Sequence, residues 1–144
     1  MPSRTNLARA RALLDRGTLI DAHNDLPWVI RTDRTARGDV AAYGLDRIHQ
    51  EGDTDIPRLR KGKVAAQVFA AFLPSEIARP ATVTLEQIDL IRRMEELHSD
   101  VFLPVRRSAD IARAKRLGKI ASITSVEGTV GLEGSLAPLR IWQA

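Results

Sequence analysis

Cysteine is absent from the 144 residues of the chain. This excludes disulfide bonds and thiolate metal ligands, because both need a cysteine sulfur. Any metal ion would have to be held by histidine nitrogens and carboxylate oxygens. Only three histidines are available for such a site, His23, His49 and His98.

A long apolar run is also missing. No stretch reaches the roughly 18 consecutive apolar residues that suggest a membrane-spanning helix, and Met1-Pro2-Ser3-Arg4 leads into no apolar signal core. We therefore expect a cytoplasmic protein without a membrane span. The arginines among the first 17 residues fit either a transit peptide or an ordinary surface helix, and we favour the helix. These arginines are Arg4, Arg9, Arg11 and Arg16.

The basic residues do not form one continuous stripe, although the formal net charge is +4 and the pI is about 10.1. They lie scattered among acidic and apolar neighbours, and no aromatic residues alternate with them as in many nucleic-acid interfaces. We therefore expect no nucleic-acid partner. The scattered basic residues are Arg58, Arg60, Lys61, Lys63, Arg92, Arg93, Arg106 and Arg107.

The length and composition are those of a folded domain or part of one. A chain of this length buries roughly 70% of its unfolded surface on folding, and 44% hydrophobic with 28% charged residues is ordinary for a globular protein. Helical and strand-like segments alternate along it. We predict helices at 5–16 (ended by a left-handed Gly17), 56–61 (capped by Asp55 and closed by Gly62), 84–98 (with a Thr84 and Gln87 capping box), 109–117 (capped by Ser108 and stopped by Gly118) and from 136. We predict buried strands at 18–23, 64–72 and 119–126, a short strand at 101–103, and a polar excursion with a helical turn at 31–53.

Strand, helix, strand, helix, strand is the order typical of right-handed parallel crossovers. The sequence therefore predicts an α/β fold with a parallel sheet or barrel. In barrels of this class, active sites lie at the carboxyl ends of the strands. His23 and Asp25 end the first predicted strand and Glu127 ends the last, so together they could offer one nitrogen and two oxygens to a single cation.

Each of these residues also has an ordinary structural interpretation. Asn24-Asp25 before Leu26-Pro27 would serve as turn chemistry in many proteins, and a glutamate before glycine commonly just ends an element. Gln67, within the second strand, is as suited to satisfying a backbone group as to meeting a ligand. His49 and His98 lie in polar stretches, and we interpret both as surface residues.

Three segments resemble a known family. Asp21-Ala22-His23-Asn24-Asp25-Leu26-Pro27-Trp28 is similar to the opening motif of the membrane (renal) dipeptidase family of zinc metallopeptidases, usually Asp-Gly-His-Asn-Asp-Leu-Pro, with Ala22 in place of the glycine. The segments 54–69 and 119–128 resemble the next two blocks of that family, in the same order. The resemblance spans about residues 18 to 140, and Thr129-Val130 departs modestly from the family pattern.

The resemblance implies a (β/α)₈ barrel with two zinc ions. His23 and Asp25 match ligands of one ion, and Glu127 matches the carboxylate that bridges both. The second ion takes two histidines from later strands, and these histidines are not in this chain. The later aspartate that is thought to handle the proton during hydrolysis is not in this chain either. In the complete enzyme, a hydroxide between the metals would attack the scissile carbonyl of a dipeptide, and dipeptides with a C-terminal D-residue are accepted. Manganese or cobalt would suit the same ligand types.

A complete barrel takes about 250 residues, so we expect residues 18–144 to be the truncated first half of a dipeptidase barrel domain, preceded by a helix in residues 1–17. Beyond the metal ligands we assign no catalytic residue in this chain, and the substrate-binding residues are unknown. The main hypothesis is a zinc dipeptidase fragment with at most a partial metal site and poor activity by itself. A second hypothesis is a non-catalytic half barrel that assembles with itself or with a separate C-terminal chain. A third is a truncated product with no folded role.

Overall fold

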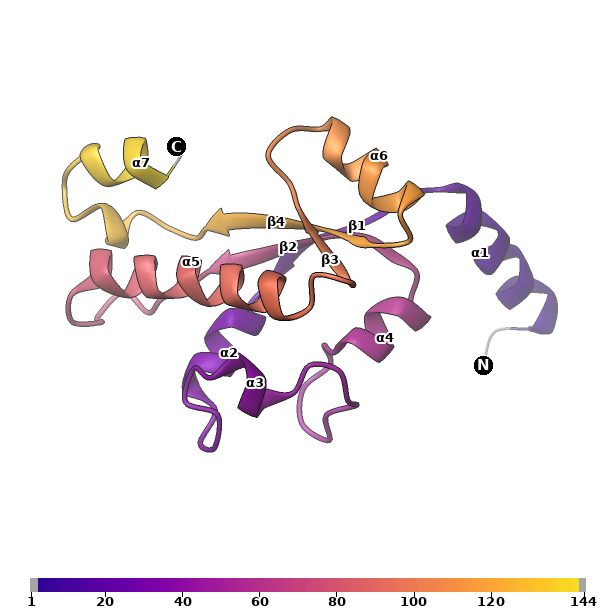
Figure 1. Cartoon of the computed structure of the whole chain (residues 1–144), viewed down its shortest axis with the longest axis horizontal. Coiled ribbons are helices and arrows are strands. Elements are labelled where there is room, and N and C mark those ends of the chain that lie inside the picture. The colour runs from indigo at the N-terminus through magenta and orange to yellow at the C-terminus, as the bar shows by residue number, and fades with distance from the viewer. Residues whose placement is uncertain (1–2, 143–144) are drawn as a thin grey trace.

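A four-stranded sheet with the order β1-β2-β4-β3 forms the centre of the structure (Figure 1). The computed structural model describes residues 3–142, and all three strand pairings in it are parallel. The predicted α/β class, a partial barrel of the (β/α)₈ kind, is therefore confirmed at the level of the sheet. The strands are β1 Leu19–Asn24, β2 Val64–Ala71, β3 Phe102–Pro104 and β4 Ile120–Val126.

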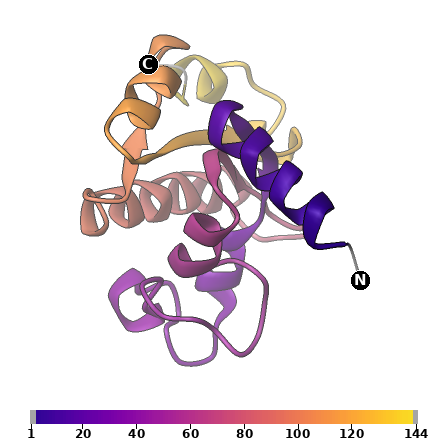
Figure 2. The same ribbon diagram turned by 90° about the vertical axis from the view of Figure 1, so that its right-hand side faces the viewer.

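Helices cover the two faces of this sheet unequally. Figures 1 and 2 show α2 to α5 on one side, here called the lower face, and α6 on the other, the upper face. None of the helices within residues 3–142 is both long enough and apolar enough to cross a membrane. The helices are α1 Arg4–Arg16, α2 Leu26–Thr32, α3 Val40–Tyr43, α4 Ile56–Lys61, α5 Pro80–Leu97, α6 Ala109–Arg116 and α7 Ala137–Trp142, with a 3₁₀ turn, η1, at Val130–Leu132.

The main hydrophobic core lies under the lower face. There Phe69 of β2 packs edge-on against Phe102 of β3, with ring centroids 5.7 Å apart, and both contribute to a cluster with buried residues of α2 to α5. The cluster comprises Leu26, Ile30, Ala36, Val40, Tyr43, Leu45, Ile56, Leu59, Phe69, Leu90, Ile91, Met94, Val101, Phe102 and Ile120. On the upper face a smaller cluster joins Ala114 of α6 to Ala66, Leu103 and Ala121 of the sheet.

Helix α5 begins earlier than predicted and has no capping box. It begins at Pro80, which suits the first turn of a helix because its missing N–H would have no partner there. Thr84 is inside the helix, where its hydroxyl donates to Pro80 O at 2.9 Å, so the predicted capping box is wrong. Gln87 instead donates to Phe72 O at 2.9 Å. Leu85 and Leu97 are each 51% exposed, whereas Val83, Leu90, Ile91 and Met94 are buried against the core.

The first helix and strand form as predicted but are not buried. Ser3 caps α1 through a hydrogen bond from Asn6 N to its hydroxyl, while Gly17 is extended (φ −77°, ψ 177°) and not left-handed as predicted. No residue of α1 is buried. The prediction of a buried first strand is wrong, because β1 is an edge strand and Leu19 and Ile20 remain 38% and 46% exposed.

The turn chemistry considered for residues 24–27 is present, since Asn24 Oδ1 accepts a hydrogen bond from Leu26 N at 2.9 Å. The turn leads directly into α2, in which Pro27 occupies the first turn. One further local prediction needs correction. The predicted Ser108 cap makes no capping hydrogen bond; the Asp110 carboxylate instead accepts hydrogen bonds from Arg106 N and Arg107 N, each at 3.1 Å.

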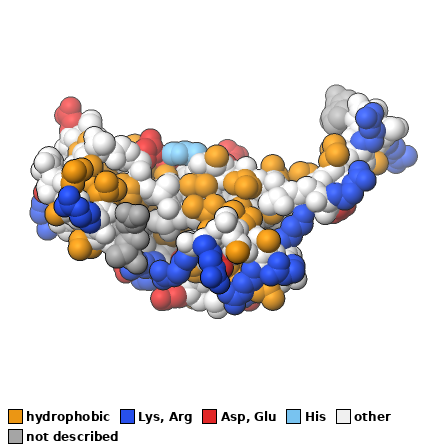
Figure 3. Space-filling model, turned by 90° about the horizontal axis from the view of Figure 1, so that it is seen from above, with side chains coloured by type: hydrophobic (Ala, Val, Ile, Leu, Met, Phe, Trp, Pro, Cys, Tyr) orange, Lys and Arg blue, Asp and Glu red, His pale blue; other side chains and the backbone are white. Residues whose placement is uncertain are grey.

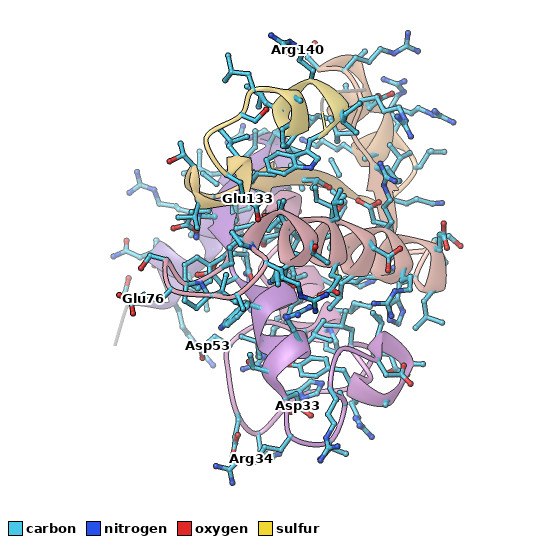
Figure 4. All side chains as sticks on the ribbon, turned by 90° about the vertical axis from the view of Figure 1, so that its left-hand side faces the viewer. Asp33, Arg34, Asp53, Glu76, Glu133 and Arg140 are labelled. Carbon is cyan, nitrogen blue, oxygen red and sulfur yellow. The ribbon has the colours of Figure 1, made fainter. Side chains whose placement is uncertain are left out.

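The other predicted elements agree with the structure. Asp55 caps α4, Gly118 is left-handed after α6 (φ +67°), and the short strand β3 includes Pro104 at the sheet edge, where proline is tolerated. After β4, Glu133 accepts a hydrogen bond from Ala81 N at 3.1 Å, which ties the η1 segment to the first turn of α5 (Figure 4). The predicted boundary at residue 17 stays a prediction, and residues 1–2 and 143–144 lie outside the described part of the chain.

Candidate metal centre

Three predicted metal ligands meet at the carboxyl ends of β1 and β4. The imidazole Nε2 of His23 lies 3.2 Å from Asp25 Oδ1 and 3.2 Å from Glu127 Oε2. One donor atom from each residue lies within 4.8 Å of the other two. Within residues 3–142 this is the group of histidine and carboxylate side chains that could hold a metal ion.

The sheet brings these residues together from distant parts of the sequence. His23 is the last residue but one of β1, and Asp25 is the N-cap residue of α2. Glu127 follows β4, where its backbone N–H contacts Ala71 O at 3.4 Å. Because β1 and β4 both run parallel to β2, their carboxyl ends meet at one edge of the sheet.

The spacing of the donor atoms fits a cation. Zinc bonds of about 2.0–2.2 Å in a tetrahedron place neighbouring ligand atoms about 3.3–3.5 Å apart, close to the two observed separations of 3.2 Å. Asp25 Oδ1 is buried and has no hydrogen-bond partner. Its short contact with His23 Nε2 therefore lacks hydrogen-bonding geometry, and a buried carboxylate oxygen without a partner is costly. The three side chains remain 53%, 46% and 44% exposed, so solutes can reach them.

The other residues considered in the sequence do not join this group. Gln67 is completely buried, and its amide donates to backbone carbonyls, including Asp21 O at 3.4 Å. His49 and His98 are half-buried, not surface residues as predicted. His49 stacks on Tyr43 at 4.2 Å, and its Nε2 lies 3.0 Å from Gly44 O. His98 lies edge-on to Phe102.

The sequence interpretation missed two residues that support the site. Asn24, between the two ligands on β1, donates through Nδ2 to Thr54 Oγ1 at 2.9 Å. Thr54 stands directly before Asp55, the N-cap residue of α4. Both residues lie in segments already noted for their family resemblance, and that was the available signal.

Comparison with known proteins decides the family. The profile of the membrane dipeptidases (peptidase family M19) matches residues 7–144. The chain belongs to this family. Its three candidate ligands therefore lie in a chain whose relatives are described as dipeptidases.

Two curated relatives show how much of such a protein this chain represents. Dipeptidase ataJ of Aspergillus terreus (strain NIH 2624 / FGSC A1156) is 36% identical over 94% of the chain, and the match covers 35% of the relative. Dipeptidase 3 of Rattus norvegicus is 38% identical over 92% of the chain, and the match covers 26% of the relative. The chain thus spans about a third or less of the length of these dipeptidases.

Solved structures give the same result for the fold. The probable dipeptidase PvdM from Pseudomonas aeruginosa superposes with a TM-score of 0.78 at 17% identity, covering 98% of this chain and 36% of that one. A metallo peptidase from Rhodobacter sphaeroides, liganded with a phosphinate mimic of the dipeptide L-Ala-D-Ala, superposes with a TM-score of 0.73 at 20% identity, covering 87% and 42%. The fold of residues 3–142 is therefore that of one part of these dipeptidase structures.

Proposed function

We propose that this chain contributes metal ligands to a dipeptide-hydrolysing site. His23 and Asp25 would hold one zinc ion, and Glu127 would be a further carboxylate ligand at the same centre. Zinc bound here would supply Lewis-acid chemistry to the peptide carbonyl and to the attacking water. The role of the three side chains is to fix the position of the metal, because each is placed by a strand end or a helix start.

The observation that carries this proposal is the meeting of one imidazole and two carboxylates around the partnerless Asp25 Oδ1. The family supports a peptide substrate, since its relatives are dipeptidases and one solved structure holds a dipeptide mimic. We extend this to dipeptides with a D-residue at the C-terminal position, as the family resemblance implies.

Elemental analysis of the purified chain tests the metal site. We expect about one equivalent of zinc per chain, retained by His49→Ala and lost by His23→Ala, because only His23 points at the two carboxylates. Manganese and cobalt should be tested in parallel because they suit the same ligands. Equal metal content in both variants, or none in the unmodified chain, would contradict the site.

Activity should be low when the chain acts alone. Among residues 3–142 the candidate group offers three ligand residues, whereas the family resemblance implies two further histidines for the second zinc. We therefore expect little or no hydrolysis in a dipeptide panel with added zinc. Hydrolysis at enzymatic rates that disappears in His23→Ala would confirm the metallodipeptidase role and disprove the need for further ligands.

A second candidate function, assembly with another polypeptide, is favoured by the open edge of β4. Strand β3 pairs with β4 only as far as Ser122, where Val105 N donates to Ser122 O at 2.8 Å. Backbone groups alternate in direction along a strand, so those of Thr124 and Val126 point to the same side of β4 as those of Ser122. No strand of the described residues pairs with them there. A cavity of about 880 Å³ runs along this edge, with Trp142 and Glu95 also in its lining.

We propose that an extended segment of a separate C-terminal chain adds to this edge as a parallel strand. The length of the relatives supports this occupant, since the match covers 35% of one relative and 26% of the other. Thr124→Pro should block the addition without unfolding the chain, because the N–H that it removes has no strand partner, whereas Ser125→Pro faces β2 and should unfold it.

Two measurements test this assembly. Light scattering over a concentration series shows whether a second copy of the chain binds instead. Co-expression with the C-terminal two thirds of a relative should yield a complex that Thr124→Pro prevents; no complex with the unmodified chain would contradict the proposal. The cytoplasmic location and the lack of a nucleic-acid partner remain predictions, to be checked by cell fractionation and by a nucleic-acid binding assay.

A further inference from the structure

The side chain of Asn24 connects the metal-ligand segment to two other elements. Its Nδ2 donates to Thr54 Oγ1 at 2.9 Å, and its Oδ1 accepts from Leu26 N at 2.9 Å. Asn24 lies between His23 and Asp25 in the sequence, so the backbone that it fixes carries both ligands. The Asn24 side-chain amide thus links the end of β1 and the start of α2 to the residue before the N-cap of α4.

The sheet itself holds this part of β1 poorly. Asp21 pairs with Gln67 and Asn24 pairs with Phe69, so three steps along β1 face two steps along β2. The irregularity falls on Ala22 and His23. A bulge of this kind redirects a side chain and weakens the local ladder. Strand pairing therefore does not by itself determine where the His23 imidazole points.

Thr54, by contrast, stands next to a firmly held residue. The completely buried carboxylate of Asp55 accepts hydrogen bonds from His49 N at 3.1 Å, Arg58 N at 2.8 Å and Arg58 Nε at 2.7 Å. Ile56 N also donates to Leu45 O at 2.9 Å. The Thr54 hydroxyl is thus a fixed point outside the sheet, half-buried and close to the ligand segment.

We propose that Asn24 and Thr54 are positioning residues for the metal centre. Their hydrogen bond transfers the rigidity of the α4 start to the irregular end of β1 and so sets the separation of the His23 and Asp25 donor atoms. This inference rests on the proposed metal site. Residues that orient ligands without touching the metal typically change its affinity by about 10- to 100-fold when they are lost.

The test compares Thr54→Val, which keeps the shape of the side chain but lacks the hydroxyl, with Thr54→Ser, which retains it. Zinc and cobalt affinities are measured by titration calorimetry, together with the visible absorption of the bound cobalt, which reports ligand geometry. We expect Thr54→Val to bind about tenfold more weakly with a changed cobalt spectrum, and Thr54→Ser to stay within about threefold. Thr32→Val is the matched control, because its hydroxyl donates to Trp28 O away from the ligands.

A readout without metal separates positioning from general stability. The unfolding midpoint in chelator should hardly differ between Thr54→Val and Thr54→Ser. Amide exchange at Leu26, whose N–H is held by Asn24, should speed up in Thr54→Val. If valine prevents folding, Thr54→Ala gives the same comparison.

The outcomes distinguish the two levels of the proposal. Metal binding by the unmodified chain with equal affinity in Thr54→Val would overturn the positioning role and leave the metal site standing. No metal binding by the unmodified chain would overturn both. Weaker binding in Thr54→Val accompanied by an equally lowered unfolding midpoint would mean that Thr54 only stabilises the fold.

Discussion

On the lower face of the sheet Phe69 is completely enclosed between β2 and α5, whereas on the upper face Ile123 is only partly covered. The lower cluster draws on α2 to α5, and the upper one on α6 alone. Figure 3, which looks onto the upper face, shows hydrophobic side chains gathered over its middle and basic side chains along α1. The same sheet is thus a closed interior on one side and an open surface on the other.

This difference separates stability from function. Burial of apolar surface is the main stabilising term in folding, so the lower face should hold the chain together. The candidate metal ligands remain about half exposed at the carboxyl edge of the sheet, where little of that stabilisation is available. Substitutions on the two faces should therefore have different consequences.

The largest expected effect comes from Phe69→Ala. Emptying a fully buried aromatic site costs about 3–5 kcal/mol of unfolding free energy, whereas Ile123→Ala on the half-open upper face should cost about 1 kcal/mol. Urea unfolding of both variants measures the difference. Equal losses would mean that the two faces stabilise the chain equally and would remove the contrast.

The next effect concerns the buried carboxylate that anchors α4. Asp55→Ala removes the helix cap and leaves Arg58 without its partner, which should cost about 2–4 kcal/mol. Asp53→Ala is the matched control. Asp53 (Figure 4) has a fully exposed carboxylate 4.0 Å from Arg58, so its removal should hardly change the stability. A similar loss in both variants would contradict the special role of Asp55.

Asp55 also gives the stability a defined dependence on pH. Burial by itself would raise the pKa of Asp55, but hydrogen bonds from the backbone of Arg58 and His49 and from the Arg58 guanidinium outweigh it, so the pKa lies below its ordinary value. A lowered pKa in the folded state contributes stability above the unfolded pKa of about 3.9 that is lost as the pH falls. The unmodified chain should therefore unfold at lower denaturant concentration as the pH falls below about 3.9. Asp55→Ala should flatten this dependence on pH.

The parallel sheet and the three ligands could be predicted because their signals lie within short stretches of the sequence. Apolar runs such as β2 and polar residues at strand ends are set by neighbouring positions, and the family motif added the roles of His23, Asp25 and Glu127. Burial could not be predicted in the same way. Leu19 and Ile20 are as apolar as the residues of β2, but they lie on an edge strand and stay partly exposed.

The hydrogen bond that supports the site could not be predicted from the sequence, because it joins residues that are far apart along the chain. Asn24 and Thr54 are thirty positions apart, and no spacing rule links them. Long-range structure also overrides the capping box that the spacing of Thr84 and Gln87 predicts. Pro80 starts the helix earlier, and Gln87 finds its acceptor on the loop after β2.

A smaller effect is expected from a second carboxylate, at the margin of the lower face. Glu95 is 7% exposed, and burial raises its pKa, with the charges of Arg92 and Arg106 opposing this. A raised pKa in the folded state means that stability is lost as the pH rises through it. Glu95→Gln should therefore stabilise the chain by less than about 1 kcal/mol at pH 8 and leave it unchanged at pH 4. If thermal unfolding at pH 8 showed Glu95→Gln to be less stable than the unmodified chain, the Glu95 charge would be fully compensated in the folded state.

The smallest effect should come from α1, which lies on neither face. Leu13 is 64% exposed and no residue of α1 is buried, so Leu13→Gln should change the unfolding free energy by no more than about 0.5 kcal/mol. Leu59→Gln, in the buried face of α4, is the contrasting substitution and should be severely destabilising because it places an amide in the main core. A clear loss of stability in Leu13→Gln, measured by denaturant unfolding at several protein concentrations, would show that α1 is covered in solution. If that loss grows with concentration, the cover is a second copy of the chain, because only an intermolecular contact depends on concentration.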